Sequence, residues 1–359
     1  MREMNPYLKL PGEQYWKTYE ESLKGKECET KVWQCQYKIT ENTKIASFGS
    51  CFAQHISKSL KDNGYNWLCT EDLPQRVPDA VAKRFGYRVF TCRTGNVYTP
   101  KMLNQWLDSA IDGEHVSISP LKSRGRYLDP MRLAVEEEGF KSLDELYALR
   151  SYTLDCFYSA VRQADVFIFT LGLTESWRSK LTGEEYSICP MAFKLENFTD
   201  DVEFYNHDFE STENALFQSI EKLTSINPDI QIILTVSPVP LIATQTQQHV
   251  LVATSESKAI LRSACGSAKR SFKNVDYFPS YEIVTNPYDS YDYFDKSRRQ
   301  VSPDGVARVM SQFLAGTGGM VTNLKGRASR LDNHAEEFDQ RVEEVCDEEL
   351  LVAFGREKV

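Results

Sequence analysis

The chain passes from strand to helix at Phe48-Gly49-Ser50-Cys51-Phe52-Ala53, and the predicted fold is built outward from this stretch. A short apolar strand over 44–48 leads into it, and an amphipathic helix over 51–63 follows it. Gly49 permits the tight turn between the two. Because N–H groups and the helix dipole favour negative charge at a helix N-terminus, the stretch predicts a site for a developing anion beside Ser50 and Cys51.

Buried strands and helices alternate through the rest of the chain. Continuous apolar runs predict strands over 165–171 and 230–236, and a shorter strand over 275–278. Helices are expected between the strands and after the last one, over 151–163, 213–225, 255–272 and 303–315. This alternation predicts a three-layer α/β/α sandwich with a mostly parallel sheet, in which ligands bind at the carboxyl ends of the strands.

The segments outside this pattern predict the organisation of the chain. Residues 66–150 are interpreted as an insertion between the first two core strands, with helical pieces over 100–111 and 142–150. The Pro-rich and aromatic segment 5–40 is expected to wrap the outside of the fold. We therefore expect one α/β domain over 1–318. A linker and an acidic amphipathic helical tail are expected over 319–359, and the tail offers a docking surface to its own domain or to a second subunit.

Composition and charge exclude several classes of protein. The 359 residues carry a net charge of −9, of which −7 falls on residues 331–359, so the remaining chain has no basic stripe for nucleic acid. The chain contains no run of about 18 apolar residues, so the sequence does not suggest a membrane span. Nine cysteines without any Cys-x-x-Cys pair argue against a disulfide framework or a zinc site. They favour the reducing cytoplasm.

Further short motifs occur along the chain, in a fixed order. They are Asn5-Pro6-Tyr7 with Leu10-Pro11 and Trp16, then Thr94–Thr99, Thr170–Trp177, Thr235–Pro240 and Tyr277–Glu282. Together with the opening stretch, over roughly residues 5–315, they resemble the GSCFA-domain family. The resemblance implies an esterase or acyltransferase of the SGNH type, with a flavodoxin-like sheet.

The resemblance also implies where the nucleophile lies. SGNH enzymes have Gly-Asp-Ser where this chain has Gly49-Ser50-Cys51. A gap-free overlay therefore places Cys51 at the position of the nucleophile. A cysteine at a helix N-terminus can be rich in thiolate, which is the attacking form. Ser50 is one residue away and stays open as the alternative.

Two further blocks are expected to supply donors to the oxyanion. Gly95, with Asn96 beside it, matches the second-block glycine of the SGNH pattern. Gly172 matches the third-block glycine at the end of a core strand. Thr174 stands where the pattern has an asparagine, with Glu175 next to it. Since one oxyanion donor is worth about 3 kcal/mol, the shorter reach of Thr174 predicts weaker catalysis.

The general base is missing from its usual place. The SGNH pattern has Asp-x-x-His before the last helix, but residues 298–303 contain no histidine. His249 follows the third core strand and so emerges at the correct edge of the sheet. A histidine in this segment also resembles many GSCFA proteins, and we predict His249 as the base. His55 is the alternative, because it lies one helical turn after Cys51.

Other charged residues remain open candidates at the site. A carboxylate that orients the imidazole is expected among Glu175, Asp276 and Glu282. Arginines that would clamp an anionic substrate are Arg93, Arg298 and Arg299, although surface arginines more often form salt bridges.

The resemblance implies an acyl-ester hydrolase or O-acyltransferase that acts on a carbohydrate or glycan through a covalent acyl-enzyme. No metal or nucleotide cofactor is implied, and a transferase would need an acyl donor such as acetyl-CoA. The absence of Asp-x-x-His favours a rival function, a weak or inactive glycan-binding or scaffold protein. An adaptor that uses the acidic tail is a third hypothesis.

Overall fold

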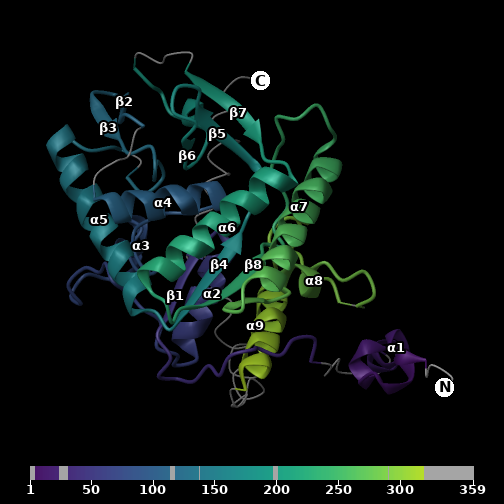
Figure 1. Cartoon of the computed structure of the whole chain (residues 1–359). Coiled ribbons are helices and arrows are strands. Elements are labelled where there is room, and N and C mark those ends of the chain that lie inside the picture. The colour runs from purple at the N-terminus through teal and green to yellow at the C-terminus, as the bar shows by residue number, and fades with distance from the viewer. Residues whose placement is uncertain are drawn as a thin grey trace.

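The computed structural model describes residues 5–23, 31–113, 118–136, 138–196, 201–289 and 291–318. A four-stranded parallel sheet lies at its centre (Figure 1). In spatial order the strands are β1 (Ile45–Gly49), β4 (Val166–Leu171), β8 (Gln231–Val236) and β9 (Val275–Tyr277). These are the four predicted core strands. The predicted tail over 319–359 lies outside the described residues.

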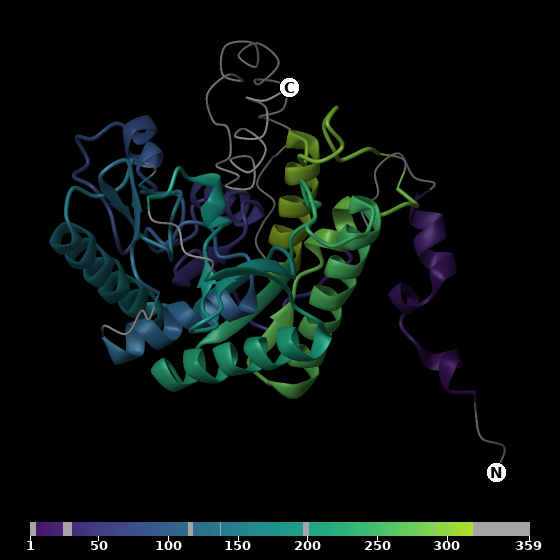
Figure 2. The ribbon, with the colours of Figure 1, turned by 90° about the horizontal axis from the view of Figure 1, so that it is seen from above.

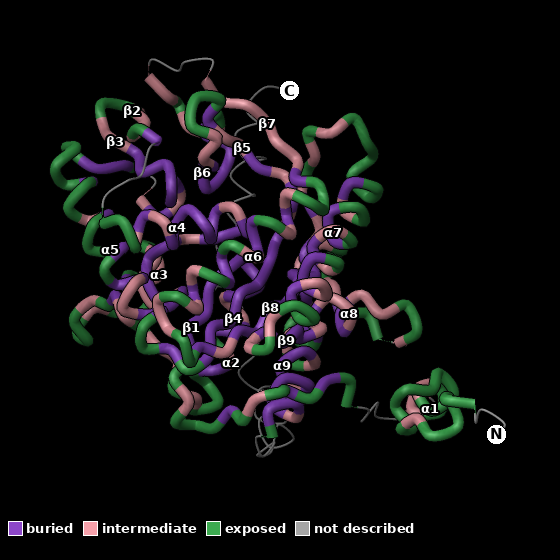
Figure 3. The backbone as a smooth tube through the Cα atoms, in the orientation of Figure 1, coloured by how far each residue is buried: buried purple, intermediate pink, exposed green. Residues whose placement is uncertain are grey.

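Helices cover both faces of the sheet, which confirms the predicted three-layer fold. One face carries α4 (Pro100–Asp112), α5 (Leu143–Gln163), α6 (Phe209–Ile226) and α7 (Val250–Ser271). The other face carries α2 (Phe52–Asp62), α8 (Ser280–Val284) and α9 (Pro303–Thr317). Because apolar residues are needed on both sides, β1 and β4 are apolar along nearly their whole length and buried throughout. Figure 3 shows this buried interior at the centre of the molecule.

Helices α5 and α7 differ most from the prediction. The pieces expected over 142–150 and 151–163 form the single helix α5, whose first turn is capped by the hydroxyl of Ser142, which accepts from the Glu145 amide at 3.1 Å. Helix α7 starts at Val250, five residues before the expected start, because His249 caps it. In both cases a capping side chain sets the start of the helix.

A second, smaller sheet was not predicted. Strand β5 (Glu175–Ser179) pairs antiparallel with β6 (Glu185–Tyr186) and with β7 (Val202–Asn206). Residues 66–150 contain a further hairpin and a short helix: β2 (Leu121–Ser123), β3 (Arg126–Leu128) and α3 (Asp79–Arg84). All of these elements are two to six residues long, and the strands are mostly half-buried, so their apolar patterns are weak.

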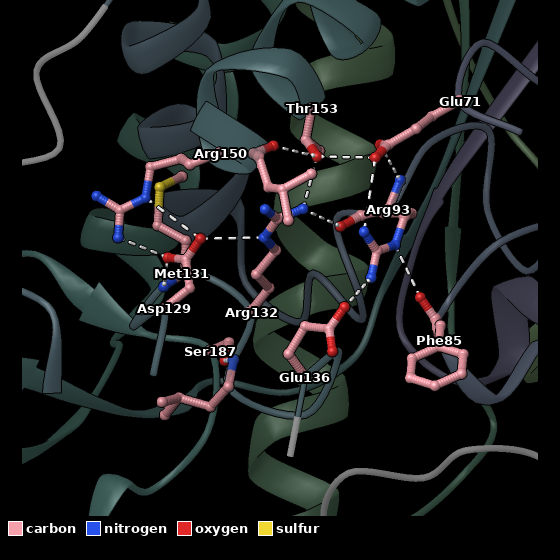
Figure 4. A network of polar contacts seen from close by, with 12 residues as sticks. Glu71, Phe85, Arg93, Asp129, Met131, Arg132, Glu136, Arg150, Thr153 and Ser187 are labelled. Carbon is pink, nitrogen blue, oxygen red and sulfur yellow. Dashed lines mark hydrogen bonds and ion pairs between the residues drawn. The ribbon is translucent and has the colours of Figure 1, made fainter. Parts of the chain in front are cut away.

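A network of buried charges lies within the 66–150 segment and α5 (Figure 4). Asp129 accepts from Arg132 at 3.0 Å and from Arg150 at 2.7 Å, and all three side chains are almost fully buried. Arg93 pairs with Glu136 at 2.6 Å in the same network. Arg93, a candidate anion clamp, is thus held in a structural network.

The N-terminal segment divides into two parts. Trp33, Cys35 and Ile39 are buried in the apolar core beneath α2 and α9. By contrast, η1 (Pro6–Lys9), η2 (Gly12–Gln14) and α1 (Trp16–Leu23) contain no buried residue. Figure 2 shows these elements extending away from the body of the molecule. We call residues 5–23 the N-terminal arm.

None of the helices in the described ranges combines the length and the apolar character that crossing a membrane requires.

Candidate functional site

The turn after β1 is held in place by backbone hydrogen bonds. The amide of Ser50 donates to the carbonyl of Thr170 at 2.9 Å, and the amide of Val97 donates to the carbonyl of Gly49 at 2.8 Å. Gly49 has φ +137°, and a Cβ at this position would lie 2.7 Å from the backbone nitrogen of Thr170. Only glycine fits so close to β4, because any side chain at this position would clash with the backbone of that strand.

A small hollow lies beside this turn, at the carboxyl ends of β1, β4 and β8. The space open to the centre of a water molecule is about 10 Å³, so the hollow has room for about one water. We call it the Ser50 hollow. Its lining residues are Ser50, Cys51, Tyr98, Gly172, Leu173, Ser237, Val239, Pro240 and Leu241. The structure thus brings together three of the predicted site residues: Ser50, Cys51 and Gly172.

Ser50 is almost completely buried, and its hydroxyl is unpaired. The residue is 1% exposed, and its Oγ has no hydrogen-bond partner among the residues that the structure describes. A buried hydroxyl without a partner costs about 1–3 kcal/mol, and few such groups occur in native proteins. Gly172 lies against it: a Cβ there would be 3.0 Å from the Cβ of Ser50 and 2.8 Å from Cδ1 of Tyr98. The absence of a side chain at Gly172 therefore keeps the hollow open.

Cys51 lines the same hollow but is also part of the apolar core. The residue is 2% exposed and stands at the N-cap position of α2, where its side chain makes no capping bond. It belongs to the apolar cluster that includes Phe52, Ile56 and Val239. Cys51 thus packs against the core while it borders the hollow.

The second-block residues do not line the hollow. Gly95 has φ +70°, and a Cβ there would meet the side chain of Val135 at 3.1 Å. Asn96 is buried, and its Oδ1 accepts from Nε2 of Gln54 at 3.2 Å. Neither Gly95 nor Asn96 lines the hollow.

The third-block donors are engaged in hydrogen bonds within the protein. The amide of Gly172 donates to the carbonyl of Tyr98 at 2.9 Å. The hydroxyl of Thr174 donates to Oδ1 of Asn206 at 2.7 Å. Neither group is free to donate to an oxyanion in this conformation.

Glu175 holds the loop that follows β8. Its carboxylate accepts from the hydroxyl of Thr244 at 2.5 Å and from the amide of Gln245 at 3.1 Å. The same loop contributes Val239, Pro240 and Leu241 to the wall of the hollow. Glu175 therefore fixes a wall of the hollow from outside it.

His249 and His55 both lie outside the lining of the hollow. His249 is exposed and caps α7, where its Nδ1 accepts from the amide of Leu251 at 3.2 Å. His55 is half-buried in α2, with its ring centroid 5.4 Å from that of Phe52. Burial, together with the charge of Lys58, lowers the pKa of His55 to about 4, so its imidazole is neutral at pH 7.

The other charged candidates pair elsewhere among the described residues. Asp276 accepts from Lys269 at 2.7 Å, and Glu282 accepts from Arg262 at 2.5 Å. Arg298 pairs with Asp292. None of the described residues that line the hollow is a histidine, a carboxylate or a lysine.

Sequence reasoning missed several residues at or just behind the hollow. Ser237 directly follows β8, so the strand-end rule would have found it. Tyr98 precedes the N-cap of α4 and lies within the motif Thr94–Thr99, but the prediction gave a role only to Gly95 and Asn96 of that motif. Lys258 is buried in α7, and its Nζ donates to the carbonyl of Gly172 at 2.6 Å. It therefore holds the strand end that faces Ser50.

A second buried polar cluster supports the segment that contains Tyr98. The carboxylate of Glu185 accepts from the hydroxyl of Thr99 and contacts Nε2 of His207. Burial alone would raise the pKa of Glu185, but the hydrogen bond from His207 keeps it below its usual value. The cluster joins the small sheet to the start of α4.

A comparison with family models matches the GSCFA family over residues 44–313. The chain belongs to the GSCFA family. This confirms the resemblance predicted from the motifs. A search of the curated proteins finds no match.

Two solved structures are distantly similar to this GSCFA protein. One is a Streptococcus pneumonia protein described as a candidate platelet activating factor, with 10% identity and a TM-score of 0.28 over 60% of this chain and 91% of that chain. The other, from Corynascus thermopiles (Myceliophthora fergusii), is a carbohydrate esterase family 2 enzyme with a carbohydrate binding domain. It has 10% identity and a TM-score of 0.31 over 79% of this chain and 68% of that chain.

Proposed function

We propose that this GSCFA protein is an acyl-ester hydrolase or O-acyltransferase that acts on a carbohydrate or glycan through a covalent acyl-enzyme. The observation that carries the proposal is the unpaired, buried hydroxyl of Ser50 beside a hollow at the N-terminus of α2. A nucleophile at this place would attack an acyl carbonyl next to the start of the helix. The helix dipole and first-turn amides would then stabilise the oxyanion.

Within the proposal, the nucleophile is Ser50. The overlay with SGNH enzymes favours Cys51, but Cys51 packs in the apolar cluster beneath α2. The hydroxyl of Ser50 is the group left without a partner. Cys51 then shapes the turn and stays the alternative nucleophile that the experiment below discriminates.

The oxyanion is assigned to the dipole at the start of α2 and to the amides of Cys51 and Phe52, because the amides of Ala53 and Gln54 already donate to the carbonyls of Ser50 and Cys51. The predicted donors Gly172 and Thr174 are bonded within the protein, and Gly95 and Asn96 do not line the hollow. Acyl transfer supported by the helix N-terminus, without a dedicated side-chain donor, predicts slow turnover.

The general base is proposed to be His249. Support comes from its place at the end of the loop whose residues Val239 and Leu241 wall the hollow. The loop must move for the imidazole to reach Ser50, since His249 is exposed in this conformation. His55 is the second candidate, because its neutral ring can accept a proton at pH 7. Removal of the true base should lower kcat by about 10²–10⁴-fold.

The size of the hollow favours a small acyl group such as acetyl. The hollow has room for about one water, and Tyr98, Leu173 and Leu241 enclose it. An acetyl group is larger than one water, so it would already have to displace one of these side chains, and a longer acyl chain would have to displace more of them.

The proposal is tested by acylation with p-nitrophenyl acetate. We expect slow release of nitrophenol and one acetyl group per chain, mapped by mass spectrometry to the peptide 45–58. Ser50→Ala should abolish the adduct, and Cys51→Ala should retain it. An adduct lost only in Cys51→Ala would reverse the assignment. Absence of both turnover and adduct in the native protein would refute the acyl-enzyme.

A weak or inactive glycan-binding or scaffold protein is the second candidate function. It is favoured by the lack of any histidine or carboxylate among the described residues that line the hollow. It predicts no turnover and no adduct, with glycan binding retained. The cytoplasm stays the proposed location, and it is consistent with the seven cysteines within the described ranges, none of which is in a disulfide there.

A further inference from the structure

A larger groove lies between the N-terminal arm and the segment that follows β9. Its volume is about 470 Å³, within the range of small-molecule sites. Its lining includes Trp16, Tyr19, Asn286, Tyr288, Asp289 and Arg308. It shares no lining residue with the Ser50 hollow. We call it the aromatic groove.

Two exposed aromatic rings form the rim of the aromatic groove. Trp16 of α1 is 61% exposed and Tyr288 is 59% exposed. Their rings meet edge to face with centroids 4.9 Å apart. Flat aromatic faces of this kind pack well against the C–H face of a sugar ring, which is apolar while its edge carries hydroxyl groups. Of the five tryptophans in the chain, only Trp16 is exposed.

Polar groups lie beside the rings. Arg308 of α9 is half-buried, and its carbonyl accepts from the hydroxyl of Ser311 at 2.8 Å. Its guanidinium forms no ion pair or hydrogen bond with any residue in the described part of the chain. Its guanidinium therefore offers up to five N–H donors to a ligand. Asp289 accepts from the hydroxyl of Tyr293 at 2.9 Å, which fixes its carboxylate while leaving further acceptor capacity.

The charges that line the aromatic groove are mixed. Arg308 is positive, whereas Glu282 and Asp289 are negative, and Glu282 is paired with Arg262. A strongly charged ligand such as a phosphate would meet carboxylates as well as the guanidinium. A hydroxyl group can donate to a carboxylate and accept from a guanidinium, so a neutral polyhydroxylated ligand fits both.

We propose that the aromatic groove binds a neutral saccharide, with one sugar ring stacked on Trp16 or Tyr288 and its hydroxyls bonded to Asp289 and Arg308. The site lies beyond the acyl chemistry proposed for Ser50 and does not depend on it. Helix α1 buries no residue of its own and contacts the body through the Trp16–Tyr288 ring pair and a hydrogen bond from Asn286 to Tyr19, so a bound saccharide would strengthen this connection.

The test uses the native protein and four neutral hexasaccharides: cellohexaose, xylohexaose, N-acetylchitohexaose and maltohexaose. Tryptophan fluorescence and calorimetry should show saturable binding to at least one of them. Trp16→Ala and Arg308→Ala should each weaken that binding by about tenfold or more. Trp16→Phe, which keeps an aromatic face, should retain it within a few-fold, and so should Leu181→Ala, a change at an exposed apolar residue that does not line the groove.

Further readouts separate this proposal from the acyl chemistry. Ser50→Ala should bind the saccharide as the native protein does, whether or not acylation is lost. Saccharide should also slow hydrogen exchange of the α1 amides. No saturable binding to any of the four sugars, or binding unchanged in Trp16→Ala, would overturn the proposal. So would binding of a synthetic peptide 331–353 to the groove in place of every sugar.

Discussion

At the scale of the residue, the site depends on close approach of backbone and small side chains. Gly49 is fixed by its positive φ, and Gly172 by its contact with Ser50 and Tyr98. Neither position accepts a side chain without displacing a neighbour. The unpaired hydroxyl of Ser50 is kept in a narrow space by glycines on adjoining strand ends.

Gly172→Ala should close the Ser50 hollow. The added Cβ would lie 2.8 Å from Cδ1 of Tyr98, so we expect a loss of stability of about 1–3 kcal/mol from overpacking. Acylation by p-nitrophenyl acetate should fall by about 10²-fold, because Ser50 is displaced. Gly266→Ala in α7 is the matched control, since its Cβ would meet only the ends of arginine side chains. Full acylation of Gly172→Ala would contradict the assignment of the hollow.

His55 should make the stability depend on pH. Its pKa is about 4 in the folded protein and 6.5 ordinarily, so the unfolded chain binds the proton first as the pH falls. The free energy of unfolding is therefore not reduced by His55 above pH 6.5. Between pH 6.5 and pH 4 it falls by at most about 1.4 kcal/mol per pH unit. Urea unfolding between pH 4 and pH 7 measures this. His55→Gln should have a flatter profile, and an unchanged slope would rule out His55 as its source.

At the scale of the element, buried charges hold α5 against the 66–150 segment. Asp129→Ala would leave the guanidinium groups of Arg132 and Arg150 buried without their partner. We expect it to lower the free energy of unfolding by about 3–5 kcal/mol. Asp79→Ala, which breaks an ion pair with Arg88 at the surface, should have little effect in the same urea titration. Equal effects of the two substitutions would contradict this role for the network.

The sequence predicted the central sheet because buried parallel strands are apolar throughout. The residues of β4 are all buried, so their pattern is continuous and needs no partner to be recognised. The small sheet was missed because β7 is half-buried and β6 has only two residues. The meeting of Ser50, Cys51 and Gly172 followed from the strand-end rule.

The rest of the site could not be predicted in this way. Tyr98 and Leu173 belong to the motifs Thr94–Thr99 and Thr170–Trp177, but the motifs did not predict that their side chains line the hollow. These residues and Leu241 reach the hollow from loops, and a loop's path depends on tertiary contacts such as that of Glu175 with Thr244. The engagement of Thr174 with Asn206 is likewise a contact between distant segments. A contact between distant segments leaves no pattern in the local sequence from which it could be predicted.

At the scale of the whole molecule, the N-terminal arm adds little to the stability of the body. Since residues 5–23 bury no side chain, deletion of residues 1–23 should change Tm by less than about 2 °C. The same deletion should abolish saccharide binding at the aromatic groove, because Trp16 and Tyr19 are removed. Thermal unfolding followed by circular dichroism measures the first effect, and calorimetry with the hexasaccharides measures the second. A large fall in Tm would show that the arm belongs to the core.

The pairing of β1 with β4 also has a consequence during synthesis. The two strands are adjacent in the sheet, yet about 120 residues separate Gly49 from Leu171. At roughly 5–20 residues per second, a ribosome needs about 6–24 s to deliver the neighbour of β1. For that interval an apolar segment must stay unpaired in the nascent chain, where chaperones that shield such segments would act.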